Sequence, residues 1–403
     1  MGNLNQTPSA NRLHISFFGC RNAGKSSVVN AITGQELSIV SDIKGTTTDP
    51  VTKSMELLPL GPVVIIDTPG IDDVGKLGEK RVQRTKKILN KTDIAVLVVD
   101  GTLGMRAADQ ELIDLFCQKE IPYLIVYNKS DLMQDIPLAG EKEIWVSAAD
   151  KANIQELKER LGLLIPTDSM THKLVGQLLQ PLDVVILVCP IDESAPKGRL
   201  ILPQQQTIRD VLEAGAIAVV VREHELAAAL EQLNGKAAMV ITDSQAFSMV
   251  SAVAPDSIPL TSFSILMANY KGFLKTAVEG ISALKNLKDG DKILIAEGCT
   301  HHRQCNDIGS VKLPRWLLKY TGKNLDFEFC SGLEFPEELN EYALVVHCGG
   351  CMLTEREIQY RMRCTVDSGV PFTNYGTVIA LVTGTLERSL RVFPEIHKLL
   401  SSS

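Results

Sequence analysis

The sequence contains no hydrophobic run long enough to cross a membrane. Its longest apolar runs, such as Val184–Cys189 and Ile94–Val99, have the length of a strand, whereas a membrane-spanning helix needs about 20 apolar residues. The segment Met1–Arg12 is polar and has no hydrophobic stretch of the kind found in a secretory signal. Gln6 stands where an N-myristoylation signal requires serine or threonine. We therefore expect a cytoplasmic protein without a membrane partner.

Basic residues are not in excess. The chain has 41 lysines and arginines against 48 aspartates and glutamates, which gives a net charge of −7. A broad nucleic-acid-binding surface is usually basic, so we expect no nucleic-acid partner, although a local basic patch is compatible with this charge. With 45% hydrophobic residues, the 403-residue chain can form two or three domains with cores of their own.

Disulfides are not expected, although the chain has nine cysteines. Disulfides are rare in cytosolic proteins. Five of the cysteines lie in or beside apolar stretches, and we interpret them as small buried hydrophobic residues. These five are Cys20, Cys117, Cys189, Cys330 and Cys364.

The first part of the chain alternates between strand and helix patterns. Helical patterns at Gly78–Leu89 and Ala107–Gln118 lie between apolar strand patterns. This alternation predicts an α/β fold with a mostly parallel sheet covered by helices on both faces. The expected strands are Leu13–Phe18, Val63–Ile66, Ile94–Val99, Tyr123–Tyr127 and Glu143–Val146.

Two further α/β units follow a break in the pattern at Ile165–Gln180. We expect three domains, at residues 1–166, 167–267 and 268–403. The middle one has short apolar strands, such as Asp183–Val188 and Ala216–Val221, but no phosphate loop and no catalytic cluster. This composition indicates an association module. In the last domain, strands are expected at Lys292–Ala296, Asp326–Phe329 and Ala343–His347.

A phosphate-binding loop follows the first strand. Gly19–Ser26 fits the pattern G-x-x-x-x-G-K-[ST] and precedes a helical segment that begins at Ser27. In such a loop the backbone N–H groups surround the phosphates, Lys25 reaches the β- and γ-phosphates, and the Ser26 hydroxyl is a ligand of Mg²⁺. The predicted nucleotide-binding residues of this segment are Gly19, Asn22, Ala23, Gly24, Lys25, Ser26 and Ser27.

Further motifs resemble the GTPase signature. In Asp67-Thr68-Pro69-Gly70, the resemblance assigns Asp67 to Mg²⁺ through water and the Gly70 N–H to the γ-phosphate. Gly45–Asp49 resembles the first switch loop, with Thr47 as the second Mg²⁺-binding hydroxyl. Thr46 and Thr48 are adjacent alternatives to Thr47.

The base-binding motifs favour guanine over adenine. Asn128-Lys129-Ser130-Asp131 matches the guanine-reading motif, and Ser147-Ala148 matches the last base-contacting loop. The Asp131 carboxylate can accept hydrogen bonds from the N1–H and the 2-amino group of guanine, and adenine has neither donor. We therefore predict a GTP-hydrolysing enzyme.

The glutamine that positions the attacking water in small signalling GTPases is replaced by Ile71. Asn22 and Lys44–Thr48 instead resemble the potassium-dependent branch of GTPases, in which the asparagine binds K⁺. We expect catalysis to depend on Lys25, Thr47 and Asn22, with K⁺ as a cofactor. The alternative is that Asn22 only caps the loop.

Two fragments near the C-terminus have metal-ligand spacing. Cys348-x-x-Cys351 places two thiols in one tight turn, and Cys299 supplies a third. His301 and His347 flank these cysteines. From spacing alone, a Cys₃His zinc site and an iron–sulfur cluster remain equally open. His302 and Cys305 are alternative ligands close to the first fragment.

The whole chain resembles HydF, the family of [FeFe]-hydrogenase maturation GTPases, whose first domain belongs to the superfamily of TrmE and Era. The resemblance rests on the order of the motifs, on the segment Ala195–Gln206, and on the C-x-H and H-C-x-x-C fragments with the stretch Cys299–Arg315. It implies a GTPase domain, a middle dimerisation domain and a C-terminal metal-cluster domain.

The resemblance also implies a cofactor and partners. It assigns a [4Fe–4S] cluster to Cys299, Cys348 and Cys351, with His301 or His347 as a candidate fourth ligand. It implies a homodimer or higher homo-oligomer that acts as scaffold and carrier for the diiron subcluster. The implied partners are two radical-SAM maturases and the apo-[FeFe]-hydrogenase.

Two other functions remain as alternatives. One is an RNA-associated GTPase of ribosome or tRNA maturation, which would have a basic RNA-binding appendage. The other is a regulatory GTPase stabilised by zinc.

Overall fold

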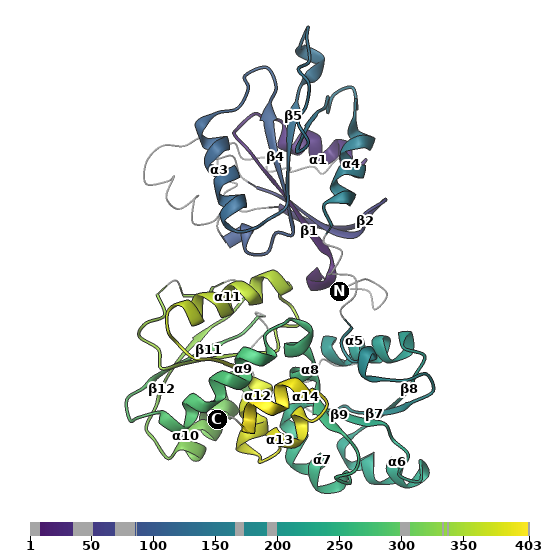
Figure 1. Ribbon diagram of the computed structural model, residues 1–403, viewed down its shortest axis with the longest axis vertical. Coiled ribbons are helices and arrows are strands. Elements are labelled where there is room, and N and C mark those ends of the chain that lie inside the picture. Colours follow the sequence, from purple (N-terminus) through teal and green to yellow (C-terminus); the bar gives the residue numbers. More distant parts are fainter. Residues whose placement is uncertain are drawn as a thin grey trace. The chain divides into compact units, whose positions relative to one another are not determined.

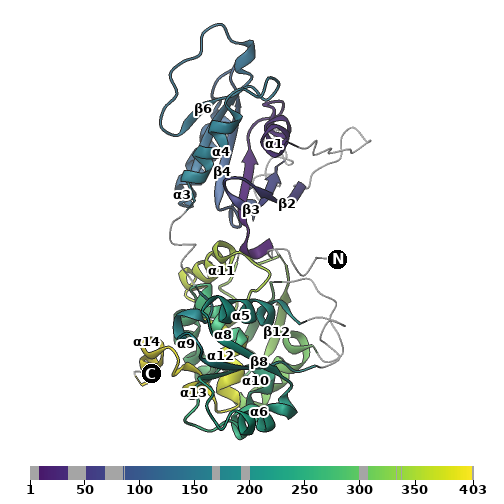
Figure 2. The ribbon, with the colours of Figure 1, turned by 90° about the vertical axis from the view of Figure 1, so that its right-hand side faces the viewer.

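A computed structural model describes most of the chain. The described residues are 9–34, 51–68, 85, 87–165, 173–191, 200–298, 307–332, 334–336 and 338–401. Of the predicted site residues, Thr47, Gly70, Cys299 and His301 lie outside these ranges. The chain divides into two compact units, Met1–Met170 and Thr171–Ser403, which are drawn in Figures 1 and 2.

The first unit contains a six-stranded sheet with the order β2-β3-β1-β4-β5-β6. β2 and β3 are antiparallel and all the other pairs are parallel. The predicted, mostly parallel sheet is therefore confirmed, with β2 as an additional edge strand. The strands are β1 (Leu13–Phe18), β2 (Val51–Leu57), β3 (Gly61–Asp67), β4 (Ile94–Asp100), β5 (Tyr123–Asn128) and β6 (Glu143–Trp145).

Helices cover both faces of this sheet (Figure 1). One hydrophobic cluster contains Val28 of α1 (Lys25–Thr33) and Leu157 of α4 (Ile154–Leu163). A separate cluster contains Phe116 of α3 (Ala107–Gln118). Consecutive strand residues point to opposite faces, so the continuously apolar strands supply both clusters.

The second unit contains two four-stranded parallel sheets, with the orders β10-β9-β7-β8 and β12-β11-β13-β14. A single hydrophobic cluster includes buried residues from both sheets. The strands are β7 (Val184–Val188), β8 (Ile217–Val221), β9 (Met239–Thr242), β10 (Leu260–Ser262), β11 (Lys292–Ala296), β12 (Asp326–Cys330), β13 (Leu344–His347) and β14 (Phe372–Asn374).

The second unit has a middle part, with the sheet β10-β9-β7-β8, and a C-terminal part, with the sheet β12-β11-β13-β14. One helix, α8, packs against helices of both parts. α8 contacts α5 of the middle part and α12 of the C-terminal part, and four of its residues in succession, Ile265–Ala268, are buried. The helices are α5 (Leu202–Glu213), α6 (Leu226–Gln232), α7 (Phe247–Val253), α8 (Phe263–Tyr270), α9 (Leu274–Gly280), α10 (Leu313–Thr321), α11 (Glu355–Asp367), α12 (Tyr375–Val382), α13 (Leu386–Leu390) and α14 (Pro394–His397).

The expected burial of the isolated cysteines is correct for two of them. Cys20 and Cys189 are buried, Cys330 and Cys364 are partly buried, and Cys117 is exposed. The expectation for Cys117 was wrong because this residue lies next to the C-terminal end of α3, where its side chain remains exposed although its thiol lies 4.0 Å from the Tyr123 hydroxyl. Among the described residues, no helix is long and apolar enough to span a membrane.

Candidate functional site

The phosphate loop connects β1 to α1 through a backbone that requires glycine at two positions. Gly19 has φ 138° and Gly24 has φ 89°, in the region that residues with a side chain rarely adopt. A Cβ at Gly19 would lie 2.1 Å from the Val98 carbonyl oxygen, and a Cβ at Gly24 would lie 2.2 Å from Asn128 Nδ2. Both glycines therefore allow the loop to pass close to the ends of β4 and β5.

The Lys25 side chain closes this loop. Lys25 is 8% exposed, and its Nζ donates to the carbonyl oxygens of Gly19 and Cys20 at 2.9 Å each. Lys25 is also the first residue of α1, where the N-terminal N–H groups favour anions. The Lys25 ammonium and the N-terminus of α1 together provide positive charge at the place where the phosphates of a nucleotide are expected.

Ser26 and Asp67 form a pair of oxygen donors beside the loop. Ser26 Oγ donates to Asp67 Oδ2 at 2.7 Å. Asp67 Oδ1 is buried and has no hydrogen-bond partner among the described residues. Burial raises the pKa of Asp67, and the Ser26 hydrogen bond and the Lys25 charge oppose this increase. A buried carboxylate oxygen that still needs a partner, next to a hydroxyl, fits Mg²⁺, which prefers oxygen ligands.

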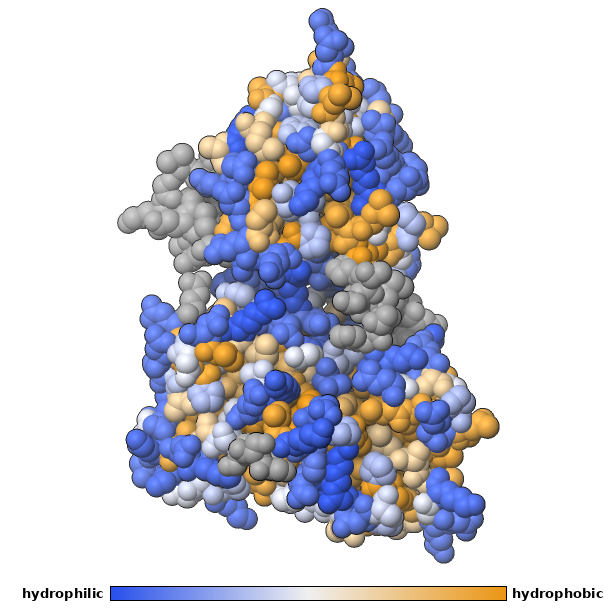
Figure 3. All heavy atoms as spheres, viewed as in Figure 1, coloured by the Kyte–Doolittle hydropathy of each residue, from blue (hydrophilic) through white to orange (hydrophobic). Residues whose placement is uncertain are grey.

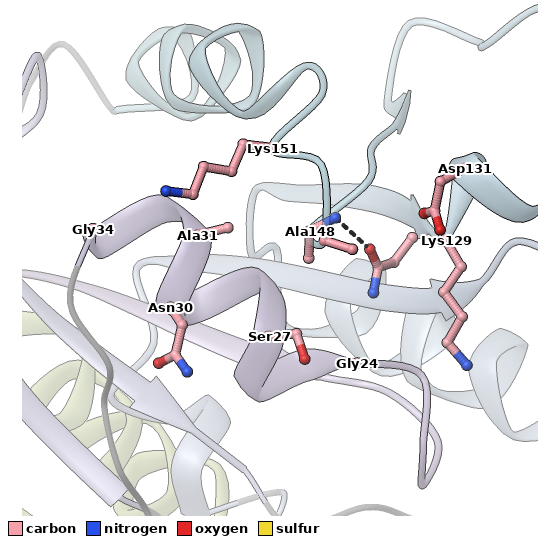
Figure 4. A pocket seen from close by; sticks show the side chains of 11 residues that line it. Gly24, Ser27, Asn30, Ala31, Gly34, Lys129, Asp131, Ala148 and Lys151 are labelled. Atoms are coloured by element: carbon pink, nitrogen blue, oxygen red, sulfur yellow. Dashed lines mark hydrogen bonds between the residues drawn. The ribbon is translucent and has the colours of Figure 1, made fainter.

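A cavity of about 560 Å³ lies next to α1 and is lined by both base-binding motifs (Figure 4). Its lining includes Gly24, Ser27, Asn128, Lys129, Asp131 and Ala148. Asn128 connects the two sides of this cavity, because its Nδ2 donates to the Ala23 carbonyl at 3.1 Å and its Oδ1 accepts from the Ala148 N–H at 3.1 Å. The phosphate loop and the base-binding loops thus form one continuous site.

Lys129 is held by Asp100, which lies outside the sequence motifs of the site. Its Nζ donates to Asp100 Oδ2 at 2.5 Å, and its backbone has φ 68°. Burial alone would raise the pKa of Asp100, but hydrogen bonds from Lys129 and Thr102 lower it. The register pairs Asp100 with Asn128 at the ends of β4 and β5. If β4 and β5 had been known to be neighbours, Asp100 could have been placed beside Lys129.

The phosphate loop also contacts α3. Cys20 Sγ donates to Asp109 Oδ1 at 3.4 Å, and Asp109 Oδ2 accepts from the Arg106 N–H at 3.1 Å. Asp109 is buried. It therefore caps the N-terminus of α3 and holds the loop at the same time.

Two other predicted site residues lie in the described part of this unit. Asn22, the predicted K⁺ ligand, lies in the phosphate loop with φ 64°. Ser147 is buried after β6, and its Oγ accepts a hydrogen bond from the Asp150 N–H at 3.0 Å.

The Cys348–Cys351 turn follows β13 directly. Cys348 Sγ accepts hydrogen bonds from the N–H groups of Gly298 at 3.1 Å and Gly350 at 3.3 Å. The Cys348 N–H in turn donates to the Ala296 carbonyl at 2.9 Å. The ends of β11 and β13 are therefore joined at this turn. Cys299, which follows Gly298 in the sequence, lies outside the described residues.

Both thiols of this turn lie in a low-dielectric environment. Burial raises the pKa of Cys348. Burial, together with the charge of Cys348, raises the pKa of Cys351 to about 12. Thiolates at these positions need compensating positive charge, and a bound metal centre supplies such charge. Among the described residues, no group of three or more histidine, cysteine, aspartate or glutamate side chains could hold a metal ion.

Both ring nitrogens of His347 have contacts inside the C-terminal part. It is completely buried, its Nδ1 lies 2.7 Å from the Cys348 carbonyl oxygen, and its Nε2 lies 3.3 Å from Arg361 Nη1. Its ring stacks on Phe372 at 5.9 Å between centroids. Burial, together with the Arg361 charge, lowers the pKa of His347 to about 3. The imidazole is thus neutral, with Nδ1–H as donor and Nε2 as acceptor.

Comparison with protein families gives three matches in succession. A 50S ribosome-binding GTPase model matches residues 14–129. A hydrogen maturase F dimerization domain matches residues 174–272, and a hydrogen maturase F tetramerization domain matches residues 275–392. The two hydrogen maturase F models together cover more than half of the chain.

Similar curated proteins are GTPases. GTPase Der of Wolinella succinogenes is 36% identical over 174 residues, which are 39% of this chain and 36% of that protein. GTPase Der of Kosmotoga olearia is 33% identical over 171 residues, 38% of each chain. The tRNA modification GTPase MnmE of Streptococcus agalactiae is 34% identical over 153 residues, 37% of this chain and 33% of that protein. This chain thus spans between 33% and 38% of the length of these relatives.

Among solved structures, Aquifex aeolicus Era bound to GDP and AlF₄⁻ is similar, with a TM-score of 0.34 and 20% sequence identity. That match covers 55% of this chain and 97% of the other.

Proposed function

The chain belongs to the hydrogen maturase F family, and from this membership we propose that it is a GTP-hydrolysing scaffold that carries a [4Fe–4S] cluster and delivers a diiron subcluster to apo-[FeFe]-hydrogenase. GTP hydrolysis and binding of Mg²⁺ follow from the match of its first domain to GTPases. The observation that carries the proposal is the Cys348–Cys351 turn, which is joined by hydrogen bonds to the segment that leads into Cys299.

We assign the cluster to Cys299, Cys348 and Cys351. Two N–H groups already point at the Cys348 sulfur, and such donors stabilise sulfur ligands of iron–sulfur clusters. Three cysteines leave one iron open to a weaker ligand, through which a further metal fragment can be attached. His301 remains the histidine candidate for that position. We give His347 a positioning role, because ligation through Nε2 would break its contact with Arg361.

The GTPase half acts on this site indirectly in our proposal. The nucleotide contacts are those predicted for the phosphate loop, Thr47, Asp67, Gly70, Asn128, Lys129, Asp131, Ser147 and Ala148. The nucleotide state alters contacts with the two radical-SAM maturases and the apo-hydrogenase, and hydrolysis performs no chemistry on the cluster. The proposed domains are 1–166, 167–267 and 268–403, in a protein that acts in the cytoplasm.

Anaerobic reconstitution with iron and sulfide tests this function. We expect broad absorption at about 400 nm and an EPR signal in the reduced state, both typical of iron–sulfur clusters. The reconstituted protein, loaded with a diiron complex, should then activate apo-hydrogenase. Firm retention of one zinc ion with no cluster formed would contradict the proposal and favour a zinc-stabilised regulatory GTPase.

Potassium is expected to accelerate GTP hydrolysis at least tenfold over sodium at equal ionic strength. A K⁺ ion bound by Asn22 would add positive charge beside the phosphates as negative charge develops. The measurement is the turnover rate in KCl and in NaCl for the wild type and for Asn22→Ala. Equal rates of the wild type in both salts would refute K⁺ as a cofactor.

The exposed edge of the middle sheet is the proposed dimer contact. β8 lies at the end of its sheet and is entirely apolar, with Ile217 46% and Val220 44% exposed. Leu182 and Leu212, nearby in this part, are also exposed, and Figure 3 shows apolar side chains gathered over β7 and β8. An exposed apolar edge strand is a template for pairing with another chain. The hydrogen maturase F dimerization match includes this strand.

Val220→Lys is expected to shift the protein from dimer to monomer, with at least a tenfold higher dissociation constant. The added ammonium would have to be desolvated against the apolar strand of a second copy. Analytical ultracentrifugation over a concentration series measures the shift. Met249→Lys, on an exposed face of α7, is the matched control and should stay dimeric. An unchanged dissociation constant for Val220→Lys would place the dimer contact elsewhere.

A further inference from the structure

A buried lysine lies where the middle part of the second unit meets its C-terminal part. Lys271 directly follows α8, precedes Gly272 with φ 73°, and is only 2% exposed. Its carbonyl oxygen accepts a hydrogen bond from Gln359 Nε2 of α11 at 2.7 Å. A Cβ at Gly272 would lie 2.7 Å from the same Gln359 nitrogen. The backbone at Lys271 is therefore fixed against the helix that follows the cysteine motif.

The ammonium group of Lys271 contacts the turn that carries Cys351. Its Nζ donates to the Leu353 carbonyl oxygen at 3.2 Å, and the Leu353 N–H donates to the Gly350 carbonyl at 3.0 Å. Cys351 lies inside this turn. Burial raises the pKa of Cys351, as does the charge of Cys348, while the charge of Lys271 lowers it. The charge of Lys271 thus lowers the pKa of the Cys351 thiol, although the two residues are 80 positions apart in the sequence.

The ammonium group of Lys271 also lies near an aromatic ring. Its Nζ lies 5.4 Å from the centroid of the Tyr270 ring. Because the ammonium is buried, the local dielectric constant is low and its charge acts more strongly on the turn than it would in water.

We propose that Lys271 is a positioning residue whose positive charge favours the reduced state of the cluster held by the Cys348–Cys351 motif. The inference rests on the proposed function, because it requires a cluster at this motif. A three-thiolate [4Fe–4S] site is anionic, and reduction adds one electron without breaking a bond. A nearby buried ammonium stabilises the additional negative charge. The residue belongs to the segment that links the association module to the cluster.

The test compares three variants of the full-length protein after anaerobic reconstitution. Lys271→Gln keeps a donor for the Leu353 carbonyl but removes the charge, Lys271→Met removes both, and Lys271→Arg keeps both. The midpoint potential is measured by titration with dithionite and followed by EPR, and iron content is measured in parallel. Lys275→Gln, an exposed lysine of α9 paired with Glu279 at 3.9 Å, is the control.

We expect both neutral variants to be at least tenfold harder to reduce, which is a shift of about 59 mV to more negative potential for a one-electron couple. Lys271→Arg and Lys275→Gln should stay within a small fraction of that shift. Loss of the cluster from both neutral variants, with retention in Lys271→Arg, would also support the requirement for charge.

Two results would overturn the inference while leaving the proposed function intact. One is a cluster of unchanged potential in Lys271→Gln and Lys271→Met. The other is a shift in Lys271→Met alone, which would show that the hydrogen bond to Leu353 matters and the charge does not. If the wild type itself forms no cluster, the proposed function fails first, so the two failures are distinguishable.

Discussion

Asp131→Asn is expected to lower the affinity for GTP by about a hundredfold or more. Asp131 lines the cavity beside the phosphate loop, where its carboxylate can accept two hydrogen bonds from guanine. Hydrogen bonds to charged groups contribute about 1.5–3 kcal/mol each, and the substitution removes one of the two and leaves the other to a neutral amide oxygen, at a total cost of about 3 kcal/mol. The asparagine N–H would also face a guanine N–H. Equilibrium titration with a fluorescent GTP analogue measures the loss.

The same variant should gain affinity for xanthosine triphosphate, because xanthine has a carbonyl where guanine has its 2-amino group. Asp135→Asn, which makes the same charge change in the following exposed segment, is the matched control and should bind GTP as the wild type does. Equal weakening by both substitutions would show that only net charge is involved. Unchanged GTP affinity of Asp131→Asn would remove Asp131 from base recognition.

The sequence could indicate which residues line the cavity beside the phosphate loop, because their motifs are short and lie at the carboxyl ends of parallel strands. Gly19 to Ser26 is a local pattern, and β1, β3 and β5 bring Asp67 and Asn128 to the same sheet edge. The contacts of Lys129 with Asp100 and of Cys20 with Asp109 depend on which strands and helices are neighbours. Sequence spacing contains no information on that order, so these contacts were missed.

The C-terminal site shows a second limit of sequence patterns. Next to two cysteines, His347 has the spacing of a ligand, and only the fold reveals that Arg361 occupies its Nε2. Lys271 was missed for a similar reason. It lies far from the motif in sequence, and nothing in its local pattern distinguishes it from a surface lysine. Its proposed role depends on its burial, and Lys271 is buried at the end of α8, which packs against α5, α9 and α12.

The short edge strands were missed for a different reason. β10 and β14 have three residues each, too few for an alternating or apolar pattern to stand out. They form because longer neighbours, β9 and β13, present hydrogen-bonding edges to them. Tertiary pairing therefore determines these strands.

Cys348→Ser is expected to abolish the cluster, with iron content and absorption at about 400 nm falling at least tenfold. The Cys348 sulfur lies in a partly buried turn and already accepts two backbone N–H hydrogen bonds. Serine fits the same space, but its hydroxyl hardly ionises at neutral pH and its oxygen is a harder ligand than thiolate. The variant therefore removes the proposed ligand while it keeps the turn.

Cys364→Ser separates this effect from a general loss of thiols. Cys364 lies on α11, partly buried in the same C-terminal part, and is not assigned to the cluster. Its substitution should leave iron content within about twofold of the wild type, since a hydroxyl at this position removes no ligand. Circular dichroism establishes that both variants are folded. A full complement of iron in Cys348→Ser would exclude this cysteine as a ligand, and with it the three-cysteine site that the proposed scaffold function requires.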